Sequence, residues 1–441
     1  MGATLASGGR DHVTDRQKAN ALIRHYAKVG GKGLLPKRIR CGKDRRPISL
    51  AEILNALRRL KTGKAPGKDG LYAEFYKHIG PLALKWLHVS VWRSFAKGEV
   101  PGPWKHGVIV PVPKPGKPPG DPASYRPVTL TSVAAKIAER VVAERLVYQV
   151  FPVLALNQLG FRRNCATSDV TASAVDHILR CFNRYTDTGS NYDGKDRHHF
   201  TSGRAAGILF DMTAAFDKVD HTILIRKLLG MGVDRHTVRW LRNFLVCRQS
   251  QVRVNETYGS TQTFSRGVPQ GTVLGPILFI VYVNDLLVAL SSVPNSKTWM
   301  YADDLTVVAS GTGAAACVLP LQAASAIVSE WCTVNNMLVS VKTEGILFSP
   351  SNGTLEDRTP VVIQCGAVSV SLKVHTPGVV AVSPTLLGVT LDRSMHMHDH
   401  VKAIVKDVNA RISQLAALSA SKWGPSTHSM RTFYKGYVET V

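Results

Sequence analysis

The feature that most constrains this chain is a pair of acidic residues set between two apolar segments. Thr298–Ser310 reads TWMYADDLTVVAS, so Asp303 and Asp304 are flanked on both sides by residues typical of strands, which predicts a β-hairpin with the acids at its turn. A second apolar run, GILFD, ends at Asp211 and is predicted to be a buried strand. Burying paired carboxylates without a cation is costly. The pattern therefore favours a cation site over an exposed Asp-Asp turn, which would leave the apolar flanks unexplained.

Carboxylates on neighbouring strands suit one class of chemistry. The joining of nucleotides is an in-line phosphoryl transfer that uses two magnesium ions, one activating the attacking 3′-hydroxyl and one stabilising the leaving pyrophosphate. Magnesium prefers oxygen ligands and keeps water and substrate phosphate in its shell, so a few protein carboxylates are enough. One Asp at a strand end and two at a neighbouring hairpin turn would supply them.

The composition is that of a basic globular protein. The 441 residues include 55 Lys and Arg against 31 Asp and Glu, a formal charge of +24, which favours a polyanionic partner such as nucleic acid but would also fit a solvated basic surface. With 44% hydrophobic residues the chain can form two or three subdomains. Its seven Cys never occur as C-x-x-C, which argues against a disulfide scaffold and a zinc finger and indicates a reducing compartment.

No segment is predicted to cross a membrane. The most apolar stretch, Val273–Leu290, is interrupted by Pro276, Asn284 and Asp285 and is interpreted as a buried core segment. The N-terminus lacks the apolar core of a signal peptide. Residues 1–46 are rich in Gly, Lys and Arg with weak periodicity, so we interpret them as a basic flexible segment in preference to a nucleic-acid-binding arm or a nuclear signal.

Helical and extended patterns alternate after residue 46. Ser49 and Glu52 form a capping-box pattern at a helix start. GKAPGKDG (Gly63–Gly70) breaks that helix and lacks the Ser or Thr of a phosphate-binding P-loop, which excludes an ordinary nucleotide hydrolase. The pattern predicts an α+β fold with a mixed or antiparallel sheet. Further strands are expected at 108–115 and 125–130, helices at 137–146, 223–229, 314–335 and 401–415, and a surface loop at 186–204.

Five motifs resemble those of reverse transcriptases, in that family's order. They are SYRPVTL (Ser124–Leu130), NQLGFRRNCAT (Asn157–Thr167), FDMTAAFDKVDH (Phe210–His221), SRGVPQGTVLGPILF (Ser265–Phe279) and YADD (Tyr301–Asp304). Together with GKAPGKDG and LLGVTLD (Leu386–Asp392), they are most similar to non-LTR (LINE-type) retrotransposons, near the LINE-like elements of trypanosomatids.

The resemblance implies a right-hand polymerase fold with a small antiparallel palm sheet backed by helices. Residues 47–205 would form the fingers with part of the palm, 206–395 the palm with the catalytic motifs, and 396–441 the start of a thumb, interpreted as truncated. The implied activity is RNA-directed DNA polymerisation, in which a primer 3′-hydroxyl attacks the α-phosphate of a deoxynucleoside triphosphate. Asp211, Asp303 and Asp304 would be the catalytic ligands of two Mg²⁺ ions, with Mn²⁺ able to substitute.

The resemblance also implies substrate contacts. Phe216 would abut the 2′ position of the sugar and exclude ribonucleotides, although core packing is the reading preferred without the family match. Gln270 would bind the nucleotide, and Gly271 would let the backbone approach a base pair. Tyr301 lies in the same YADD motif as the paired acids and is assigned to substrate binding.

Two Arg residues, one Lys and a His cluster complete the candidates. The forked guanidinium groups of Arg126 and Arg162 would clamp the triphosphate. WCTVNNMLVSVKTEGILF (Trp331–Phe348) resembles a later palm motif whose Lys protonates pyrophosphate, which makes Lys342 the candidate acid. HMHDH (His396–His400) has metal-binding residue types, but a structural or surface role is preferred over zinc.

The implied partners are an RNA template, a DNA primer or target DNA, and dNTPs. The nucleus is the expected site of action, with a ribonucleoprotein stage in the cytoplasm. One alternative is a truncated, inactive RNA-binding remnant, although all three acids are present. Another is an RNA-dependent RNA polymerase, against which Phe216 and YADD argue. The oligomeric state, the template and the presence of endonuclease, RNase H or zinc-knuckle domains elsewhere stay open.

Overall fold

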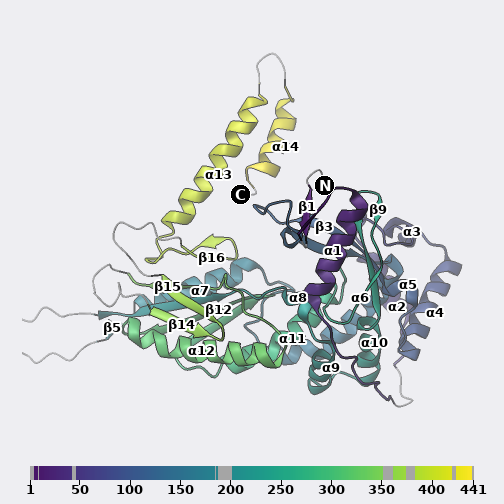
Figure 1. The fold of residues 1–441 in the computed structure, drawn as a ribbon, viewed down its shortest axis with the longest axis horizontal. Coiled ribbons are helices and arrows are strands. Elements are labelled where there is room, and N and C mark those ends of the chain that lie inside the picture. Colours follow the sequence, from purple (N-terminus) through teal and green to yellow (C-terminus); the bar gives the residue numbers. More distant parts are fainter. Residues whose placement is uncertain are drawn as a thin grey trace, which may run out of the picture. The chain divides into compact units, whose positions relative to one another are not determined.

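The computed structural model describes residues 4–7, 9–41, 46–183, 185–186, 201–350, 361–373, 383–419 and 424–439. Its helices and strands form two compact units (Figure 1). Unit 1 contains Met1–Asn164, Met212–Ala289 and Ser329–Val339, and unit 2 contains Cys165–Asp211, Leu290–Val328 and Ser340–Val441. Because the chain passes repeatedly between them, the contiguous segments expected for fingers, palm and thumb do not coincide with these units.

Unit 1 contains a five-stranded sheet covered by helices. The strands follow the order β10-β8-β3-β4, and β9 pairs with β8; β3 runs parallel to β8, and the other pairs are antiparallel. The expected extended segments are confirmed as β3 and β4. The strands are β1 (Leu5–Ser7), β2 (Arg10–His12), β3 (His106–Pro113), β4 (Tyr125–Leu130), β8 (Arg248–Val254), β9 (Thr257–Tyr258) and β10 (Gln262–Phe264).

The helices of unit 1 include most of the apolar segment Val273–Leu290, interpreted from its sequence as a buried core segment. Residues 278–283 of α11 are fully buried, which confirms that this segment is a core helix. The helices are α1 (Asp15–Gly30), α2 (Leu50–Arg58), α3 (Ala73–Lys77), α4 (Pro81–Lys97), α5 (Gly102–Lys105), α6 (Val133–Val150), α8 (Ala215–Lys218), α9 (His221–Gly230), α10 (Arg235–Leu245) and α11 (Gly275–Leu290), with 3₁₀ turns η1 (Pro122–Ser124) and η2 (Phe151–Val153).

The interpretation of residues 1–46 as a flexible segment is wrong for α1. Thr14 and Gln17 form a reciprocal capping box at its start. Leu22 and Ile23 are fully buried and pack in one core with Val252 and Val254 of β8. The apolar face was hard to recognise because these β8 partners lie more than two hundred residues further along the chain. Residues 42–45 of this segment lie outside the described residues.

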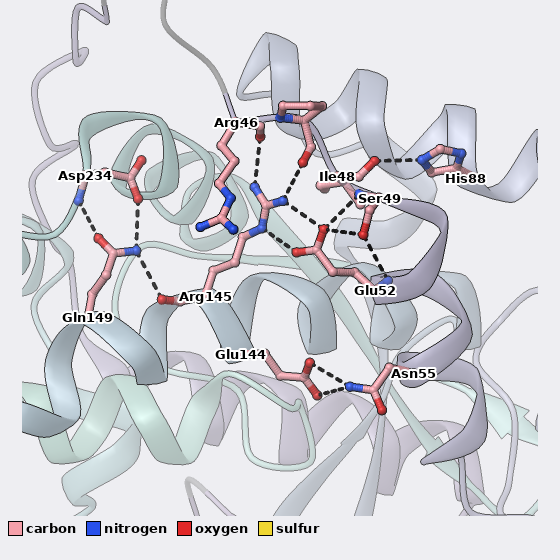
Figure 2. A network of polar contacts seen from close by, with 11 residues as sticks. Arg46, Ile48, Ser49, Glu52, Asn55, His88, Glu144, Arg145, Gln149 and Asp234 are labelled. Carbon is pink, nitrogen blue, oxygen red and sulfur yellow. Dashed lines mark hydrogen bonds and ion pairs between the residues drawn. The ribbon is translucent and has the colours of Figure 1, made fainter.

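A polar network fixes the chain where it enters α2 (Figure 2). The capping box expected from Ser49 and Glu52 is present. The Arg145 guanidinium on α6 donates to both Glu52 carboxylate oxygens, at 2.7 and 2.9 Å, and to the backbone oxygens of Arg46 and Pro47. A guanidinium bound on several sides is geometrically specific. The network therefore orders the segment that leads into α2.

Unit 2 is built on a six-stranded sheet of order β11-β12-β7-β13-β15-β14. Four of its strand pairs are antiparallel, as expected, but β13 and β15 are parallel, so the sheet is mixed. The strands of unit 2 are β5 (Tyr185–Thr186), β6 (Thr201–Ser202), β7 (Arg204–Phe210), β11 (Ser296–Tyr301), β12 (Asp304–Gly311), β13 (Glu344–Phe348), β14 (Val361–Cys365), β15 (Val368–Lys373), β16 (Thr385–Leu386) and β17 (Val389–Thr390).

The described helices of unit 2 are α7 (Thr167–Phe182), α12 (Ala314–Val334), α13 (His398–Ala417) and α14 (Thr427–Tyr437); the last residues of α12, from Ser329, belong to unit 1. Only α12 among the described helices has the length and apolar composition of a membrane span. Its residues Leu321, Ala324 and Val328 are fully buried, which is also typical of a core helix. Most of the expected loop at 186–204 lies outside the described residues.

Candidate active site

The strand register of unit 2 brings two of the three predicted acids together. Phe210, the last residue of β7, pairs with Leu305 of β12. Asp211 follows Phe210, and Asp304 precedes Leu305 on the antiparallel neighbour, so the two acids lie beside each other at one end of the sheet. Both strands are buried at nearly every position, so their pairing lies in the interior of unit 2.

The third acid lies in the turn of the predicted hairpin. Tyr301 of β11 pairs with Asp304, which leaves Ala302 and Asp303 as the two turn residues. Ala302 has a φ of +60°, the positive value that a two-residue hairpin turn needs at its first position. The hairpin expected at 298–310 is therefore confirmed, with its acids at the tip.

The carboxylates influence one another electrostatically. Asp304 keeps solvent exposure at the hairpin end, but burial of its carboxyl among protein atoms, together with the nearby Asp303 and Asp211, raises its pKa to about 6. Two neighbouring negative charges make ionisation of a third carboxyl unfavourable. A bound cation would remove that penalty, so the donor chemistry of the three Asp residues fits a hard divalent ion.

A cavity of about 310 Å³ lies beside these acids within unit 2. Asp211 and Asp304 line it, and so does Lys342, the candidate acid. The chain before Lys342 is tied to Asp211, because the Ser340 amide donates to the Asp211 carbonyl at 2.7 Å and the Asp211 amide donates to the Thr343 hydroxyl at 3.3 Å. The structure therefore places Lys342 on the wall of the cavity that Asp211 and Asp304 line.

Sequence reasoning missed two parts of this cavity. Glu344 lies on its wall at the start of β13, and Thr385–Gly388 closes another side. The latter turn joins β16 to β17, with positive φ at Leu387 (+49°) and Gly388 (+94°). The motif LLGVTLD was recognised as a family resemblance, but it carried no expectation of a place beside the acids.

Phe216, a residue of unit 1, is held by other aromatic rings. Its ring stacks on Phe279 at a centroid distance of 4.3 Å and meets Phe161 edge-on at 6.2 Å. It remains half-buried, so part of the ring is accessible. The Phe216 ring can therefore pack against its neighbours and still present an accessible edge to a substrate.

The loop Ser265–Gly271 carries the predicted nucleotide contacts Gln270 and Gly271. The Thr129 amide of β4 donates to the Gln270 carbonyl at 2.7 Å. Gly271 has a φ of +100°, and a Cβ there would lie 2.7 Å from the Thr129 carbonyl oxygen. Glycine is therefore required by the close approach of β4, a reason that the sequence did not reveal.

Two buried charged residues behind this loop, Glu139 and Arg248, were also missed. Glu139 on α6 accepts the amides of Val273 (2.8 Å) and Leu274 (3.3 Å), just after the loop. Burial raises its pKa, while Arg248 on β8 acts in the opposite direction. Neither residue stood out in the sequence, because a single charge within an apolar helix pattern gives no signal of its partner.

The two predicted triphosphate clamps occupy different surroundings. Arg126 is exposed on β4, where it pairs in register with Val112. Arg162 donates through one nitrogen to the carbonyls of Ala155 (3.1 Å) and Gln158 (3.2 Å), and its guanidinium lies 5.6 Å from the centre of the Phe151 ring. Arg162 therefore also holds the chain that follows α6.

Arg162 borders an open groove of about 940 Å³ in unit 1. Arg59, Arg140 and Arg163 also line it, together with Glu144, which forms an ion pair with Arg59 at 2.6 Å. One nitrogen of Arg140, Nη1, is buried without a hydrogen-bond partner. Tyr148, 83% exposed, lies at the same groove. Cations interleaved with aromatic rings are typical of a nucleic-acid surface.

The His cluster has structural contacts. The His396 and His398 amides donate to the Asp392 carboxylate, both at 3.0 Å, and the Thr390 amide donates to His400 Nδ1 at 3.5 Å. Within the part of the chain that the structure describes, no three His, Cys, Asp or Glu side chains form a ready metal cage. For Mg²⁺ the three Asp residues need no complete cage, since water and phosphate commonly fill its shell.

A mixed sheet with paired acids at a hairpin turn and a third acid on the adjoining strand defines a candidate phosphoryl-transfer site. Residues 112–390 match the family model described as reverse transcriptase (RNA-dependent DNA polymerase). The chain belongs to the reverse transcriptase family.

Similar proteins specify the branch of the family. The chain is 28% identical over 411 residues to a probable RNA-directed DNA polymerase from transposon BS of Drosophila melanogaster, which covers 90% of the chain and 41% of that protein. It is 27% identical to the RNA-directed DNA polymerase from mobile element jockey of the same species, covering 85% and 38%. A putative 115 kDa protein of the type-1 retrotransposable element R1DM gives 27%, covering 88% and 35%.

These relatives confirm the resemblance to reverse transcriptases of LINE-type, non-LTR retrotransposons. The chain spans about two fifths of the length of the relatives it matches. The narrower affinity to trypanosomatid elements stays a prediction.

Proposed function

We propose that this chain is the RNA-directed DNA polymerase of a non-LTR retrotransposon, adding deoxynucleotides from dNTPs to a primer 3′-hydroxyl on an RNA template. The observation that carries the proposal is the convergence of Asp211 and Asp304 on one cavity, with Asp303 near enough to raise the pKa of Asp304. The right-hand polymerase architecture, implied by the family, belongs to this proposal.

Asp211, Asp303 and Asp304 would hold two Mg²⁺ ions, with Mn²⁺ able to substitute. Bound there, the ions would lower the pKa of the primer 3′-hydroxyl and neutralise charge on the pyrophosphate. Lys342, on the wall of the same cavity, would donate a proton to the leaving group. Tyr301, which pairs with Asp304 across the hairpin, would fix the turn and line the substrate.

The residues of unit 1 would select and hold the substrates. The accessible edge of Phe216 would exclude a 2′-hydroxyl. Gln270 and Gly271 would contact the nascent pair, and Arg126 would bind the triphosphate. Arg162 would also bind the triphosphate, but only through its remaining guanidinium nitrogens, since Nη1 already binds two backbone carbonyls.

The basic groove around Arg140 and Arg163 would bind the phosphates of the template or primer strand. Such contacts release counterions and weaken as salt is added. The chain would act in the nucleus on chromosomal target DNA after a ribonucleoprotein stage in the cytoplasm.

The test is primer extension on poly(rA)–oligo(dT) with Mg²⁺ and labelled dTTP. The parent is expected to incorporate dTMP, and an Asp303→Asn, Asp304→Asn double variant is expected to incorporate none. Asp176→Asn is the matched control, because Asp176 is an exposed acid on α7 of the same unit, where it pairs with its helix neighbour Arg180.

Equal incorporation by the parent and the double variant would refute the assignment of the site. A folded parent that binds the template–primer duplex but incorporates nothing would support the alternative, a truncated and inactive RNA-binding remnant.

A further inference from the structure

The glycine-rich segment after α1 lies against the substrate loop Ser265–Gly271. Both belong to unit 1. The Gly33 amide donates to the Ser265 hydroxyl at 3.0 Å, and that hydroxyl in turn donates to the Gly31 carbonyl at 3.4 Å. Ser265 is thus bound on two sides by a segment that precedes the residues matched by the family model.

This approach is possible only because the segment contains glycine. A Cβ on Gly33 would lie 2.5 Å from the Ser265 carbonyl oxygen and 2.6 Å from Cγ of Arg266. A Cβ on Gly30 would lie 3.2 Å from the Asp217 carbonyl oxygen. Gly33 has no positive φ, so its requirement is one of space alone.

The segment is itself anchored to the helices that follow Asp217. The Thr222 hydroxyl on α9 donates to the Leu34 carbonyl at 3.2 Å. The Arg242 guanidinium on α10 donates to the Pro36 carbonyl at 2.8 Å. Residues 30–36 are thus held at one end by the buried helix α1 and further along by the bonds from Thr222 and Arg242. They form a fixed support for the loop.

The loop is bound to the same region from its other side. The Gly267 amide donates to the Val219 carbonyl at 2.8 Å, and the Val268 amide donates to the Phe216 carbonyl at 2.9 Å. The loop therefore lies between the Phe216–Val219 segment and the glycine-rich segment. The position of the loop therefore depends on hydrogen bonds to both segments.

Beneath the loop there is a cavity whose lining includes several polar side chains. It measures about 50 Å³ and is lined by Tyr26, Arg248, Arg266 and Gln270. The Tyr26 hydroxyl, Nη2 of Arg248 and Nε of Arg266 are buried there without protein hydrogen-bond partners. Such a cavity has room for a few water molecules, and it gives the loop less support than a packed core would.

We propose that Gly30–Leu34 is a positioning element for the polymerase reaction: it clamps Ser265 and Arg266 and thereby holds Gln270 and Gly271 in place for the incoming dNTP. The inference rests on the proposed function, because it takes the nucleotide as the ligand of the loop. The segment touches no reacting group itself. Loosening the clamp should weaken dNTP binding without impairing the carboxylate chemistry.

The experiment measures kcat and KM for dTTP by steady-state primer extension in Gly33→Ala, Ser265→Ala and Ser265→Thr. We expect KM to rise about fivefold or more in the two Ala variants, with kcat changed less than about twofold, since misplacing a substrate contact mainly weakens binding. Ser265→Thr retains the hydroxyl and should restore KM. Affinity for the primer–template should stay at the parent value in all three.

Gly80→Ala is the matched control. Gly80 is exposed in the same unit, has an extended backbone at φ −72°, and has open space around its Cβ position. A KM in Gly33→Ala equal to that of Gly80→Ala would overturn the proposal. So would a loss confined to kcat.

Hydrogen exchange of the loop amides separates this proposal from the proposed function. Gly33→Ala should speed exchange at Gly267 and Val268 at least about fivefold relative to Gly80→Ala, because their bonds depend on the loop position. Unchanged exchange would refute the clamp even in an active enzyme. A parent that shows no incorporation would refute the proposed function and the nucleotide role together, whatever the exchange result.

Discussion

The carboxylate site of unit 2 and the Ser265–Gly271 loop of unit 1 are positioned in different ways. Asp211 and Asp304 are fixed by a strand ladder, in which the backbone pairing of β7 and β12 leaves no freedom of register. The loop is fixed by single hydrogen bonds from three separate segments and lies over a cavity. A ladder is insensitive to the loss of one contact, whereas a loop held by single bonds is sensitive to each of them.

The strongest test of this comparison replaces one acid in each region. Asp211→Asn should lower dTMP incorporation at least about 10³-fold, since it removes several kcal/mol of transition-state charge stabilisation. Asp217→Asn, beneath the loop, should lower it less than about tenfold, because Asp217 supports the loop and is assigned no metal. Single-turnover rates measure both effects. Similar losses of incorporation in Asp211→Asn and Asp217→Asn would show that the two regions do not differ in this way.

The next test concerns the support of the loop by α1. Leu22→Ala should lower the free energy of unfolding by about 2–5 kcal/mol, because the side chain is fully buried in the α1–β8 core. Leu82→Ala, at a position 71% exposed on α4, should change it by less than about 0.5 kcal/mol. Urea unfolding followed by circular dichroism provides both values. A small effect of Leu22→Ala would restore the interpretation of a flexible N-terminal segment.

A pH titration sharpens the contrast between the acids. The pKa values of Asp304 and Asp217 are both raised to about 6, but neighbouring carboxylates contribute only to Asp304, while Asp217 is raised by burial alone. A raised folded-state pKa means that the folded protein binds the proton more tightly, so each acid makes stability fall as pH rises from about 4 through 6.

In EDTA, the melting temperature should therefore fall across this window, and less steeply in Asp304→Asn and in Asp217→Asn. Added Mg²⁺ should reduce the fall contributed by Asp304 and leave that of Asp217 unchanged. Scanning calorimetry from pH 4 to 8 measures this. An equal response of both variants to Mg²⁺ would contradict a cation site at the hairpin.

The smallest effect is expected at the basic groove. Arg163→Ala should weaken primer–template binding by about three- to tenfold and reduce the slope of log K against log salt by about 1, as for one lost phosphate contact. Arg180→Ala, an exposed residue on α7 of the other unit, is the control. Fluorescence anisotropy across a salt series distinguishes them. An unchanged slope would place the nucleic acid elsewhere.

Sequence alone predicted the features that depend on nearby residues. The β11–β12 hairpin, β7 and the capping box of α2 follow from patterns within a dozen residues, and the three acids follow with them. The parallel pairing of β13 with β15 did not follow, because strand order depends on crossovers that local patterns do not contain.

The backbone contacts of Arg162 and the steric need for Gly271 were not predicted either. Arg162 binds Ala155 and Gln158 in the turn before it, and Gly271 meets Thr129 of a distant strand. A motif indicates that a residue type is required, but not which neighbour requires it. The docking of α1 is the extreme case, since part of its apolar face packs against Val252 and Val254, far along the chain.

The distance along the chain between α1 and its core has a consequence during translation. Leu22 and Ile23 pack against residues of β8 that are synthesised much later. At ordinary elongation rates the ribosome needs roughly 10 to 50 seconds to reach them. For that interval the part of the α1 apolar face that β8 later covers stays exposed. Folding of unit 1 must therefore be a late event that follows translation through Val339, and incomplete nascent chains would be substrates for chaperones.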